Sequence, residues 1–378
     1  MSKIDISLVL PTLNEEENLK ILLPNIHLIL KEYNYEIIVV DDNSTDHTRL
    51  VAENFFKDYI RGFVHHRIGS LGLSSAIYDG FNLASGKILV VMDADLQHDE
   101  KILPKIINTI SSGDADICIA SRNIEQGSYG DLSRVRKILS KIGIWAANFF
   151  LNMRLSDPMS GFFSVSRSQF NDLKNNINPR GFKLLLEMLY KSNNAVVMHV
   201  PYQFKSRLHG KTKLTPSIGF EYLLALLDLK LGWVISYRFL QFSFVGFVGS
   251  CLNFLFFLIF LALQVPLLYS AFYAASLGMI WSFLANNFFT FSESRYTGKK
   301  IIFGGAIYLF CSLPGILVQV SVTSFIIGLF GEAVFLNVHY YFIYIFAVIL
   351  GAVLNYFIHL NITWKRIGQS ILPPSIRK

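Results

Sequence analysis

Two carboxylates and an amide alternate directly after a short apolar run in the first half of the chain. Asp93, Asp95 and Gln97 follow the run from Ile88 to Met92. If this segment stays extended, alternate side chains point to the same side of it. Three oxygen-bearing side chains there would suit a hard divalent cation that keeps open positions for phosphate oxygens. A lone Asp-x-Asp is more often a solvated loop, so the metal hypothesis needs support from its surroundings.

A second acidic pair supplies that support. Asp41 and Asp42 follow the run from Ile37 to Val40, and the same edge of a sheet would carry Asp93 and Asp95. Like charges about 4 Å apart repel by roughly 4 kcal/mol at an effective dielectric of about 20. Four carboxylates at one edge therefore favour a bound cation, and a metal-bound diphosphate would supply it. We predict a Mg²⁺ or Mn²⁺ site at this edge.

The elements that must position these residues alternate between strand and helix. Strands are predicted at residues 6–10, 37–40, 63–65, 88–92 and 117–120, and helices at residues 15–31, 46–56, 73–84 and 101–110. This βα repeat predicts an α/β fold with a mostly parallel sheet covered by helices. Ligands of such sheets bind beyond the carboxyl ends of the strands, where the acidic residues lie. No Gly-x-Gly-x-x-Gly follows the first strand, which disfavours a dinucleotide oxidoreductase.

Charge is distributed unevenly along the chain. The 378 residues include 34 Lys and Arg and 27 Asp and Glu, yet residues 237–378 hold only eight basic and two acidic residues. That segment supplies +6 of the formal net charge of +7. Because the positive excess accompanies an apolar region, it indicates a membrane rather than a nucleic acid as partner. The shift in composition predicts two domains, residues 1–236 and 237–378.

The second domain is apolar enough to cross a membrane. Residues 239–292 carry no charge and are interrupted by Gln264-Val265-Pro266, and residues 301–331 and 333–364 add two more apolar stretches. About 20 apolar residues cross a bilayer core as a helix, so we predict an integral membrane protein with four spans. Lys and Arg flank the bundle and follow the second span, which predicts that both termini and the first domain are cytoplasmic.

Two further apolar stretches are predicted to lie in the membrane interface. In residues 132–152, apolar side chains recur every three or four positions beside a basic stripe, the pattern of an interfacial amphipathic helix. Residues 216–236 contain Glu221, Asp228 and Lys230, each costing about 3 kcal/mol near a bilayer centre, against an apolar gain of roughly 4 to 5 kcal/mol. For residues 132–152, an ordinary helix packed on the first domain is the alternative.

Seven motifs in the first domain occur together and in order. They resemble those of the dolichol-phosphate mannose synthases, GT-A glycosyltransferases of family 2 that load a sugar onto a polyprenyl phosphate. The similarity spans residues 5 to about 235. The motifs run from Pro11 to Leu19, Val39 to Ser44, Asp93 to His98, Ser121 to Arg122, Asp157 to Phe162, Gly181 to Lys183 and Arg207 to Leu214.

The resemblance implies roles for individual residues. It implies a GT-A fold, a divalent cation held by Asp93, Asp95 and Gln97, and an acceptor phosphate bound by Arg122, Arg136 and Ser140. Residues implied in catalysis are Asp95, Arg122, Arg136 and Arg207. Residues implied in binding the nucleotide sugar are Pro11, Leu13, Glu15, Val40, Asp42, Asp93, Ala94, Asp95, Gln97, Arg122, Lys183, Arg207 and Lys213.

Two positions depart from the family pattern. Leu13 stands where an aromatic residue is frequent, so a stacking contact with the nucleotide base is not expected. The segment Gly210-Lys211-Thr212-Lys213 has a lysine where the family usually has an acidic residue. Asp157 could be a general base or could orient the loop that ends at Gly161, and we favour the second role.

The second domain resembles the GtrA family of four-helix membrane proteins. The resemblance rests on Phe242-x-x-Val245-Gly246, on Asn253 and on the segment from Asn286 to Phe291. Polar groups at membrane depth usually face a partner helix or a cavity, and we expect the same of these asparagines. The resemblance implies an anchor, and assistance to lipid movement stays an open second role.

Together these features predict an inverting transfer of a hexose to a polyprenyl phosphate. Mannose from GDP-mannose and dolichyl phosphate lead on resemblance, while UDP-glucose, undecaprenyl phosphate and the oligomeric state stay open. A phosphate with a second pKa of about 6 is largely ionised at neutral pH, so no strong protein base is required. A processive polysaccharide synthase would carry Gln-x-x-Arg-Trp, which is lacking here. A lipid-linked-sugar translocase with a non-catalytic head should have lost the metal or phosphate residues.

Overall fold

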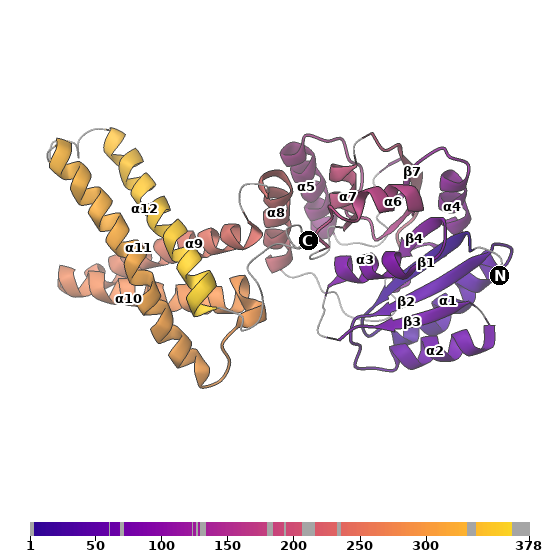
Figure 1. Ribbon diagram of the computed structural model, residues 1–378, viewed down its shortest axis with the longest axis horizontal. Helices are drawn as coiled ribbons and strands as arrows, with labels where there is room; N and C mark the ends of the chain where they lie inside the picture. The colour runs from indigo at the N-terminus through magenta and orange to yellow at the C-terminus, as the bar shows by residue number, and fades with distance from the viewer. Residues whose placement is uncertain are drawn as a thin grey trace. The chain divides into compact units, whose positions relative to one another are not determined.

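The computed structural model divides the chain into two compact units, Met1–Lys230 and Leu231–Lys378, here called the head and the helical unit. It describes residues 4–59, 61–68, 72–122, 124–125, 128, 134–179, 184–192, 194–205, 216–232, 236–330 and 338–364. Figure 1 shows strands enclosed by helices in the head and long helices alone in the helical unit.

The head is built on a seven-stranded sheet of order β3-β2-β1-β4-β6-β5-β7. All described strand pairs are parallel except those that β6 forms with β4 and β5. The sheet is therefore mostly parallel, as predicted. The strands are β1 Ile6–Thr12, β2 Tyr35–Asp41, β3 Gly62–His66, β4 Ile88–Met92, β5 Ile117–Ser121, β6 Phe162–Ser166 and β7 Val197–Pro201.

Helices cover both faces of this sheet, because alternate strand residues point to opposite sides. Leu8 and Leu10 of β1 pack in a core with α1 and α4, whereas Val9 packs in a second core with α3, α6 and α7. The apolar strands are buried on both faces, which is typical of parallel sheets. The head helices are α1 Glu16–Leu30, α2 Thr48–Tyr59, α3 Leu73–Leu83, α4 Leu103–Ser111, α6 Arg167–Leu173 and α7 Leu184–Lys191.

Two more head helices form a third, smaller core. The inner faces of α5 Arg134–Leu151 and α8 Pro216–Leu231 meet through Ala147 and Leu226, and the Tyr222 hydroxyl donates to the Gly143 carbonyl at 2.9 Å. The outer face of α5 stays exposed, with Trp145 at 64% and Phe149 at 66%. The helix is therefore packed on the head by one face while an apolar stripe remains uncovered on the other.

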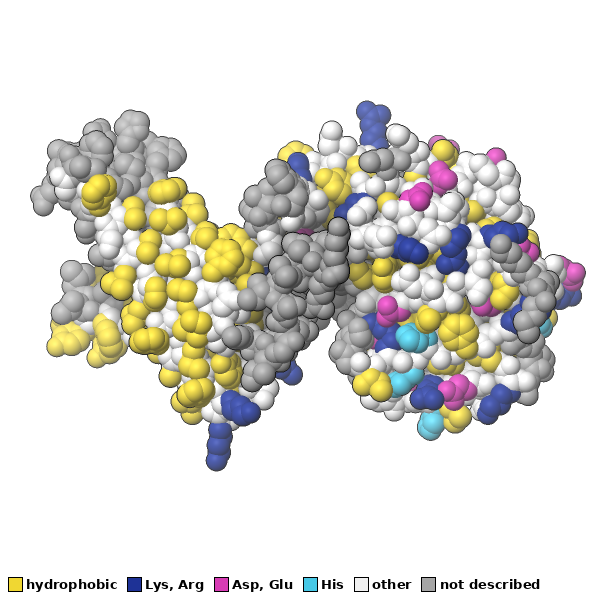
Figure 2. Space-filling model, viewed as in Figure 1, with side chains coloured by type: hydrophobic (Ala, Val, Ile, Leu, Met, Phe, Trp, Pro, Cys, Tyr) yellow, Lys and Arg dark blue, Asp and Glu magenta, His cyan; other side chains and the backbone are white. Residues whose placement is uncertain are grey.

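The helical unit consists of two helical pairs. Helix α9 Tyr237–Ala262 packs on α10 Leu267–Ala285, and α11 Lys300–Phe330 packs on α12 Val338–Ile358 (Figure 1). Gln264, with a positive φ of 60°, lies in the turn that joins the first pair, where the sequence predicts a break. Within the described residues, α9 and the Lys300–Val318 part of α11 are long and apolar enough to cross a membrane. Figure 2 shows apolar side chains gathered over this unit.

The two helical pairs repeat one another in detail. Each pair ends in a five-residue π-helix, Asn286–Thr290 after α10 and His359–Thr363 after α12. A Cβ atom on Gly249 of α9 would collide with Ser282 of α10, and one on Gly315 of α11 would collide with Asn355 of α12. Glycine leaves room for these two polar side chains. The two hairpins therefore share the same arrangement of glycines and π-helices.

Aromatic residues join the two repeats. Phe291 and Trp364, which follow the two π-helices, stack with ring centroids 4.2 Å apart and an interplanar angle of 7°. Asn287 Oδ1 accepts from the Tyr296 backbone N–H at 2.8 Å and from Trp364 Nε1 at 3.2 Å. Asn287 thus faces partner segments, as expected for a polar residue in an apolar bundle.

Candidate active site

Two loops at the carboxyl edge of the sheet clamp each other. The loop after β1 passes through Asn14 and the loop after β2 through Asn43, with positive φ angles of 57° and 65°. The Asn14 backbone N–H donates to Ser44 Oγ, and Asn14 Oδ1 accepts from the Thr45 N–H, both at 2.8 Å. The Glu15 N–H donates to Thr48 Oγ1 at 2.8 Å. Asparagine tolerates this left-handed conformation and bonds to nearby backbone, which explains its use at both turns.

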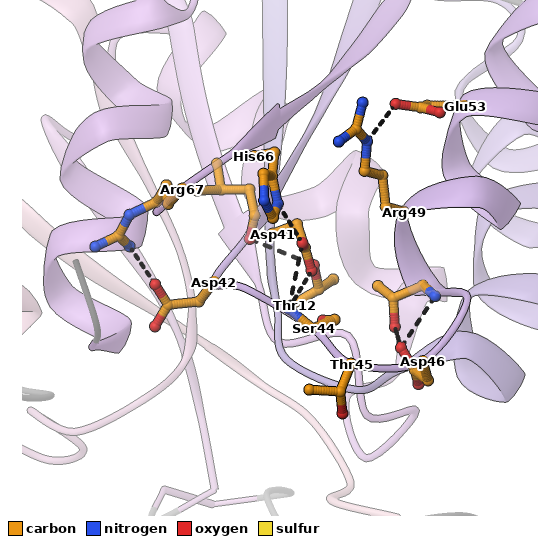
Figure 3. A network of polar contacts seen from close by, with 12 residues as sticks. Thr12, Asp41, Asp42, Ser44, Thr45, Asp46, Arg49, Glu53, His66 and Arg67 are labelled. Carbon is orange, nitrogen blue, oxygen red and sulfur yellow. Dashed lines mark hydrogen bonds and ion pairs between the residues drawn. The ribbon is translucent and has the colours of Figure 1, made fainter. Parts of the chain in front are cut away.

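Asp41 is held by groups of the head itself (Figure 3). Its Oδ2 lies 2.9 Å from His66 Nδ1 at the end of β3, and its carboxylate accepts from the Ser44 N–H at 3.3 Å. Its side chain is nearly completely buried. A carboxylate enclosed in this way has little capacity left to bind a ligand.

Asp42 is held in the same manner by Arg67. Asp42 Oδ2 accepts from the Gly72 N–H at 2.7 Å, and Oδ1 lies 3.4 Å from Arg67 Nη1. Arg67 is buried, and its Nε lies 3.3 Å from Asp79 while its Nη2 donates to Ser75 Oγ at 2.6 Å. The prediction that all four carboxylates need an external cation was therefore wrong for Asp41 and Asp42, because His66 at the end of β3 and Arg67 directly after it hold them.

The predicted metal segment is bent rather than extended. Strand β4 ends at Met92, and Leu96 has a positive φ of 59°, so strict alternation of Asp93, Asp95 and Gln97 on one side was wrong. The Gln97 N–H donates to Asp95 Oδ1 at 3.1 Å, and Gln97 Nε2 donates to the Lys205 carbonyl at 3.2 Å. Because Nε2 of Gln97 is engaged by the Lys205 carbonyl, the side-chain amide is oriented and its Oε1 is the atom that could bind a cation.

Asp93 is fitted tightly against neighbouring backbone. In the sheet register Met92 pairs with Phe162, so Asp93 lies beside Gly161, where a Cβ atom would collide with the Asp93 carboxylate. Asp93 Oδ2 lies 3.4 Å from His98 Nε2. Asp93 Oδ1 is buried and has no hydrogen-bond partner among the described residues.

The donor set fits a hard divalent cation. A buried carboxylate oxygen without a partner is costly unless a cation or water satisfies it, and carboxylate and amide oxygens are ligands of Mg²⁺ and Mn²⁺. The described part of the chain holds no cluster of three or more His, Cys, Asp or Glu side chains suited to a metal. The set of Asp93, Asp95 and Gln97 has two carboxylates and one amide, as expected where a ligand's phosphates complete the shell.

Arg122 follows β5 and is held by Asp157. Its Nε and Nη2 donate to Asp157 Oδ2 and Oδ1 at 2.9 and 2.8 Å, and its backbone N–H donates to Oδ2 at 3.2 Å. The Arg122 guanidinium also lies 5.0 Å from the centroid of the Phe204 ring. Asp157 is only 1% exposed. Both carboxylate oxygens of Asp157 are engaged by Arg122, which disfavours a general base; the group that this carboxylate orients is Arg122 rather than the loop that ends at Gly161.

Tyr202, directly after β7, joins the two groups. Its hydroxyl lies 2.9 Å from His98 Nδ1. Burial is the main cause that raises the pKa of the Tyr202 phenol, and the charges of Asp157, Asp93 and Asp95 raise it further while that of Arg122 lowers it. The phenol therefore stays protonated and lies within electrostatic range of both carboxylates of the metal segment and of the Arg122–Asp157 pair.

The remaining predicted residues are distributed as follows. Pro11 and Val40 pair in the register of β1 and β2, Leu13 and Glu15 lie in the first loop, and Ala94 is buried beside Asp93. Arg136 and Ser140 lie one turn apart on α5, although the Arg136 side chain is outside the described residues. Lys183, Arg207 and Lys213 also lie outside the described residues.

Sequence reasoning did not assign His66, Arg67 or Tyr202. Each lies at or next to the end of β3 or β7, and β7 was not predicted as a strand. The signal that could have found them is their position directly after or within a short β-branched run, the same rule that found Asp41 and Asp93.

Comparison with known proteins relates this geometry to a family. Residues 7–174 match the family described as Glycosyl transferase family 2, and residues 241–364 match the one described as GtrA/DPMS, transmembrane domain. The dolichol-phosphate mannosyltransferase of Pyrococcus furiosus is 34% identical over 362 residues, covering 95% of this chain and 99% of that protein. The chain belongs to the dolichol-phosphate mannosyltransferase family. A dolichol-phosphate mannosyltransferase of Mycosarcoma maydis is 30% identical over 231 residues, covering 59% of this chain and 78% of that protein.

The family places a glycosyltransferase head and a membrane domain in one chain. The sequence motifs indicated a family 2 glycosyltransferase in the first domain and a GtrA-like domain in the second, and both resemblances are confirmed. Among solved structures, glucosyl-3-phosphoglycerate synthase from Mycobacterium tuberculosis with Mn²⁺, uridine diphosphate and glucosyl-3-phosphoglycerate is 19% identical with a TM-score of 0.47, covering 60% of this chain and 80% of that chain. The protein is therefore a glycosyltransferase of family 2 that is attached to a membrane.

Proposed function

We propose that this protein transfers mannose from GDP-mannose to a dolichyl or other polyprenyl phosphate, with inversion at the anomeric carbon. The observation that carries the proposal is the meeting of an acidic segment and a held arginine at one sheet edge. Asp93 and Asp95 follow β4, Arg122 follows β5, and Tyr202 lies within electrostatic range of all three. This arrangement suits two anionic phosphates that must approach each other.

A divalent cation, Mg²⁺ or Mn²⁺, would be held by Asp93, Asp95 and Gln97. When bound, it would neutralise charge on the diphosphate of the leaving nucleotide. The buried Asp93 Oδ1 without a partner among the described residues supports this assignment. Gln97 is tied to Lys205, whose Nζ also lies 3.1 Å from Asp99 Oδ1. The chain after β7 is thereby fixed to the metal segment, and Arg207 and Lys213, proposed to bind the donor, come directly after it.

The acceptor phosphate would meet Arg122, Arg136 and Ser140. An ionised phosphate needs no strong protein base, so Arg122 serves to position and stabilise charge. Asp157 fixes the guanidinium plane through two hydrogen bonds, which is the geometry that arginine–carboxylate pairs favour. Arg136 and Ser140, one turn apart on α5, present neighbouring positions on a helix.

The nucleotide would lie against the two clamped loops. Pro11, Leu13, Glu15, Val40 and Asp42 surround the ends of β1 and β2. Asp42 is a poorer hydrogen-bond acceptor for ribose than predicted, because Arg67 and the Gly72 N–H already engage it. Glu15 is the carboxylate of this group that is not deeply buried.

Membrane attachment would follow the composition of the chain. We propose a catalytic domain of residues 1–236, a membrane domain of residues 237–378 with four spans, and a cytoplasmic location for both termini. The four helices α9 to α12 and the basic flanks support this topology. The exposed stripe of α5 and the helix α8 would lie in the interface, where an apolar face beside lysines meets anionic headgroups.

The test is a transfer assay on membranes that contain the full chain. Membranes are incubated with radiolabelled GDP-mannose, GDP-glucose, UDP-glucose or UDP-mannose and with dolichyl or undecaprenyl phosphate, and the organic phase is counted. We expect label from GDP-mannose with Mg²⁺ or Mn²⁺ and none from the Asp95→Ala variant. Label from UDP-glucose instead would replace the donor assignment. No transfer from any donor would favour a translocase with a non-catalytic head.

A further inference from the structure

Two buried side chains, Tyr202 and His98, connect the segment directly after β7 to the partly exposed Asp93 of the metal segment. The Tyr202 hydroxyl lies 2.9 Å from His98 Nδ1, and His98 Nε2 lies 3.4 Å from Asp93 Oδ2. Tyr202 and His98 are both almost completely buried. These contacts begin directly after β7 and end on the carboxylate of Asp93, which the sequence predicts as a metal ligand.

The chemistry of the two ends decides where the imidazole proton lies. A carboxylate only accepts hydrogen bonds, so the nitrogen that faces Asp93 must carry the proton. The Tyr202 hydroxyl contacts the other ring nitrogen, Nδ1, and thereby fixes the orientation in which His98 Nε2–H points at Asp93 Oδ2.

The walls around His98 keep the ring in place. Its centroid lies 5.4 Å from that of Phe162, 5.5 Å from that of Phe204 and 5.5 Å from that of Tyr202. Gly161 also lies against the Asp93 carboxylate, since a Cβ atom there would collide with it and would come nearest to Oδ2. The carboxylate is thus oriented by packing and by one directed donor.

We propose that Tyr202 and His98 are positioning residues that hold Asp93 Oδ2 and leave Oδ1 turned to the divalent cation. The buried Oδ1, which has no partner among the described residues, is the atom left for that purpose. This inference rests on the proposed function, because it assumes that Asp93 binds the cation. Groups behind a metal ligand typically change metal affinity by about 10- to 100-fold when removed.

The experiment measures Mn²⁺ binding by electron paramagnetic resonance on the full chain purified in detergent, without substrates. We expect Tyr202→Phe, which removes one hydroxyl, to weaken Mn²⁺ binding by about tenfold, and His98→Asn to weaken it at least as much. Tyr202 is proposed to act on Asp93 only through His98, so the double variant should bind Mn²⁺ no more weakly than His98→Asn alone. Equal Mn²⁺ affinity of Tyr202→Phe and the unmodified protein would overturn the inference.

A matched control lies at the opposite edge of the same sheet. The Tyr35 hydroxyl lies 2.8 Å from His27 Nδ1, and Tyr35 is also buried, at the start of β2. Tyr35→Phe removes an equivalent Tyr–His bond and should leave Mn²⁺ affinity unchanged. A loss equal to that of Tyr202→Phe would assign the effect to general destabilisation and contradict the inference.

Two further outcomes separate this inference from the proposed function. If Asp95→Ala binds Mn²⁺ normally, the metal assignment itself fails. If Asp95→Ala loses Mn²⁺ while Tyr202→Phe retains it, only the positioning role fails. Hyperfine coupling from a coordinated imidazole nitrogen in the unmodified protein would make His98 a ligand and would also overturn the positioning role.

Discussion

Four aspartates of the head differ in the partners that hold them. Asp157 has both oxygens on Arg122, and Asp41 and Asp42 are engaged by His66 and Arg67. Asp93 keeps one buried oxygen without a partner in the described part of the chain. Asp42 Oδ1 also lacks a hydrogen bond among the described residues, but it lies 3.4 Å from Arg67 Nη1, so Asp93 is the better candidate for a cation among these aspartates.

At the residue scale, Asp157→Asn should destabilise the head. Removing one partner of a buried ion pair leaves the other uncompensated and costs about 3 kcal/mol. We expect a lower unfolding temperature and a higher KM for the polyprenyl phosphate. Adding Arg122→Gln should restore much of the stability, because the stranded charge is gone. A double variant as unstable as Asp157→Asn would contradict the ion-pair account, and a loss confined to kcat would favour a general base.

Gly161→Ala should disturb Asp93 directly. A Cβ atom at this position would collide with the Asp93 carboxylate, so the metal ligand must shift. We expect a loss of about tenfold or more in Mn²⁺ affinity and in transfer. The control is Gly143→Ala, where the added Cβ would meet Tyr222 at an ordinary distance of 3.5 Å. Similar losses in the two variants would argue against a specific role of Gly161.

At the element scale, the βα repeat was predictable, whereas the internal strand β6 and the edge strand β7 were not. Strand β4 was predicted at its observed bounds, and β1 and β2 were each predicted two or three residues too short. β-branched runs locate buried parallel strands well, but β6 and β7 fall between loops whose pairing depends on distant segments. The bend at Leu96 was missed because nothing local requires a positive φ at a leucine.

The same limit applies to the site. Motif order located Asp93, Asp95, Gln97 and Arg122, because each follows directly after a strand or a short loop. Tyr202 and Asp157, which contact His98 and Arg122, come from other loops, and only the tertiary fold brings these pairs together. Sequence spacing cannot report such contacts.

The exposed stripe of α5 carries a prediction of its own. Trp145 and Phe149 stack at 5.5 Å between ring centroids and are mostly exposed, so they contribute little to packing in the head. The variant with Trp145→Ser and Phe149→Ser should fold normally but should lose most of its transfer to dolichyl phosphate in vesicles. Leu28→Ser, at an exposed position of α1, is the control. Unchanged transfer by the double variant would remove α5 from the membrane interface.

His199, in the strand β7 that pairs with β5, predicts that the stability of this part of the sheet depends on pH. Burial is the main cause that lowers the pKa of His199, and the charge of Asp157 opposes it. His199 therefore binds a proton more readily in the unfolded chain than in the folded one. The stability that the buried, neutral His199 permits is present above about pH 6.5 and is lost as the pH falls below that value. The protection factors of the β5 and β7 amides, which are corrected for the intrinsic pH dependence of exchange, should fall from about pH 7 to about pH 5, and less so in His199→Gln. The same pH response in both proteins would contradict this assignment.

At the scale of the whole molecule, two kinds of construction share one chain. The head is an α/β sheet with a polar edge, and the helical unit consists of two similar hairpins joined by aromatic stacking. The composition break near residue 236 marks this division, because a membrane domain excludes charge. The similarity of the two hairpins was not predicted, since they share glycine and π-helix positions rather than a run of identical residues.

The central claim is that the acidic segment after β4 holds the divalent cation that binds the donor diphosphate. The most direct measurement is a crystal structure of the full chain with Mn²⁺ and GDP, using the anomalous signal of manganese. The account predicts one ion in contact with Asp93 Oδ1, Asp95 and Gln97 and with the GDP phosphates. An ion and nucleotide bound elsewhere, with no density at these three side chains, would contradict it.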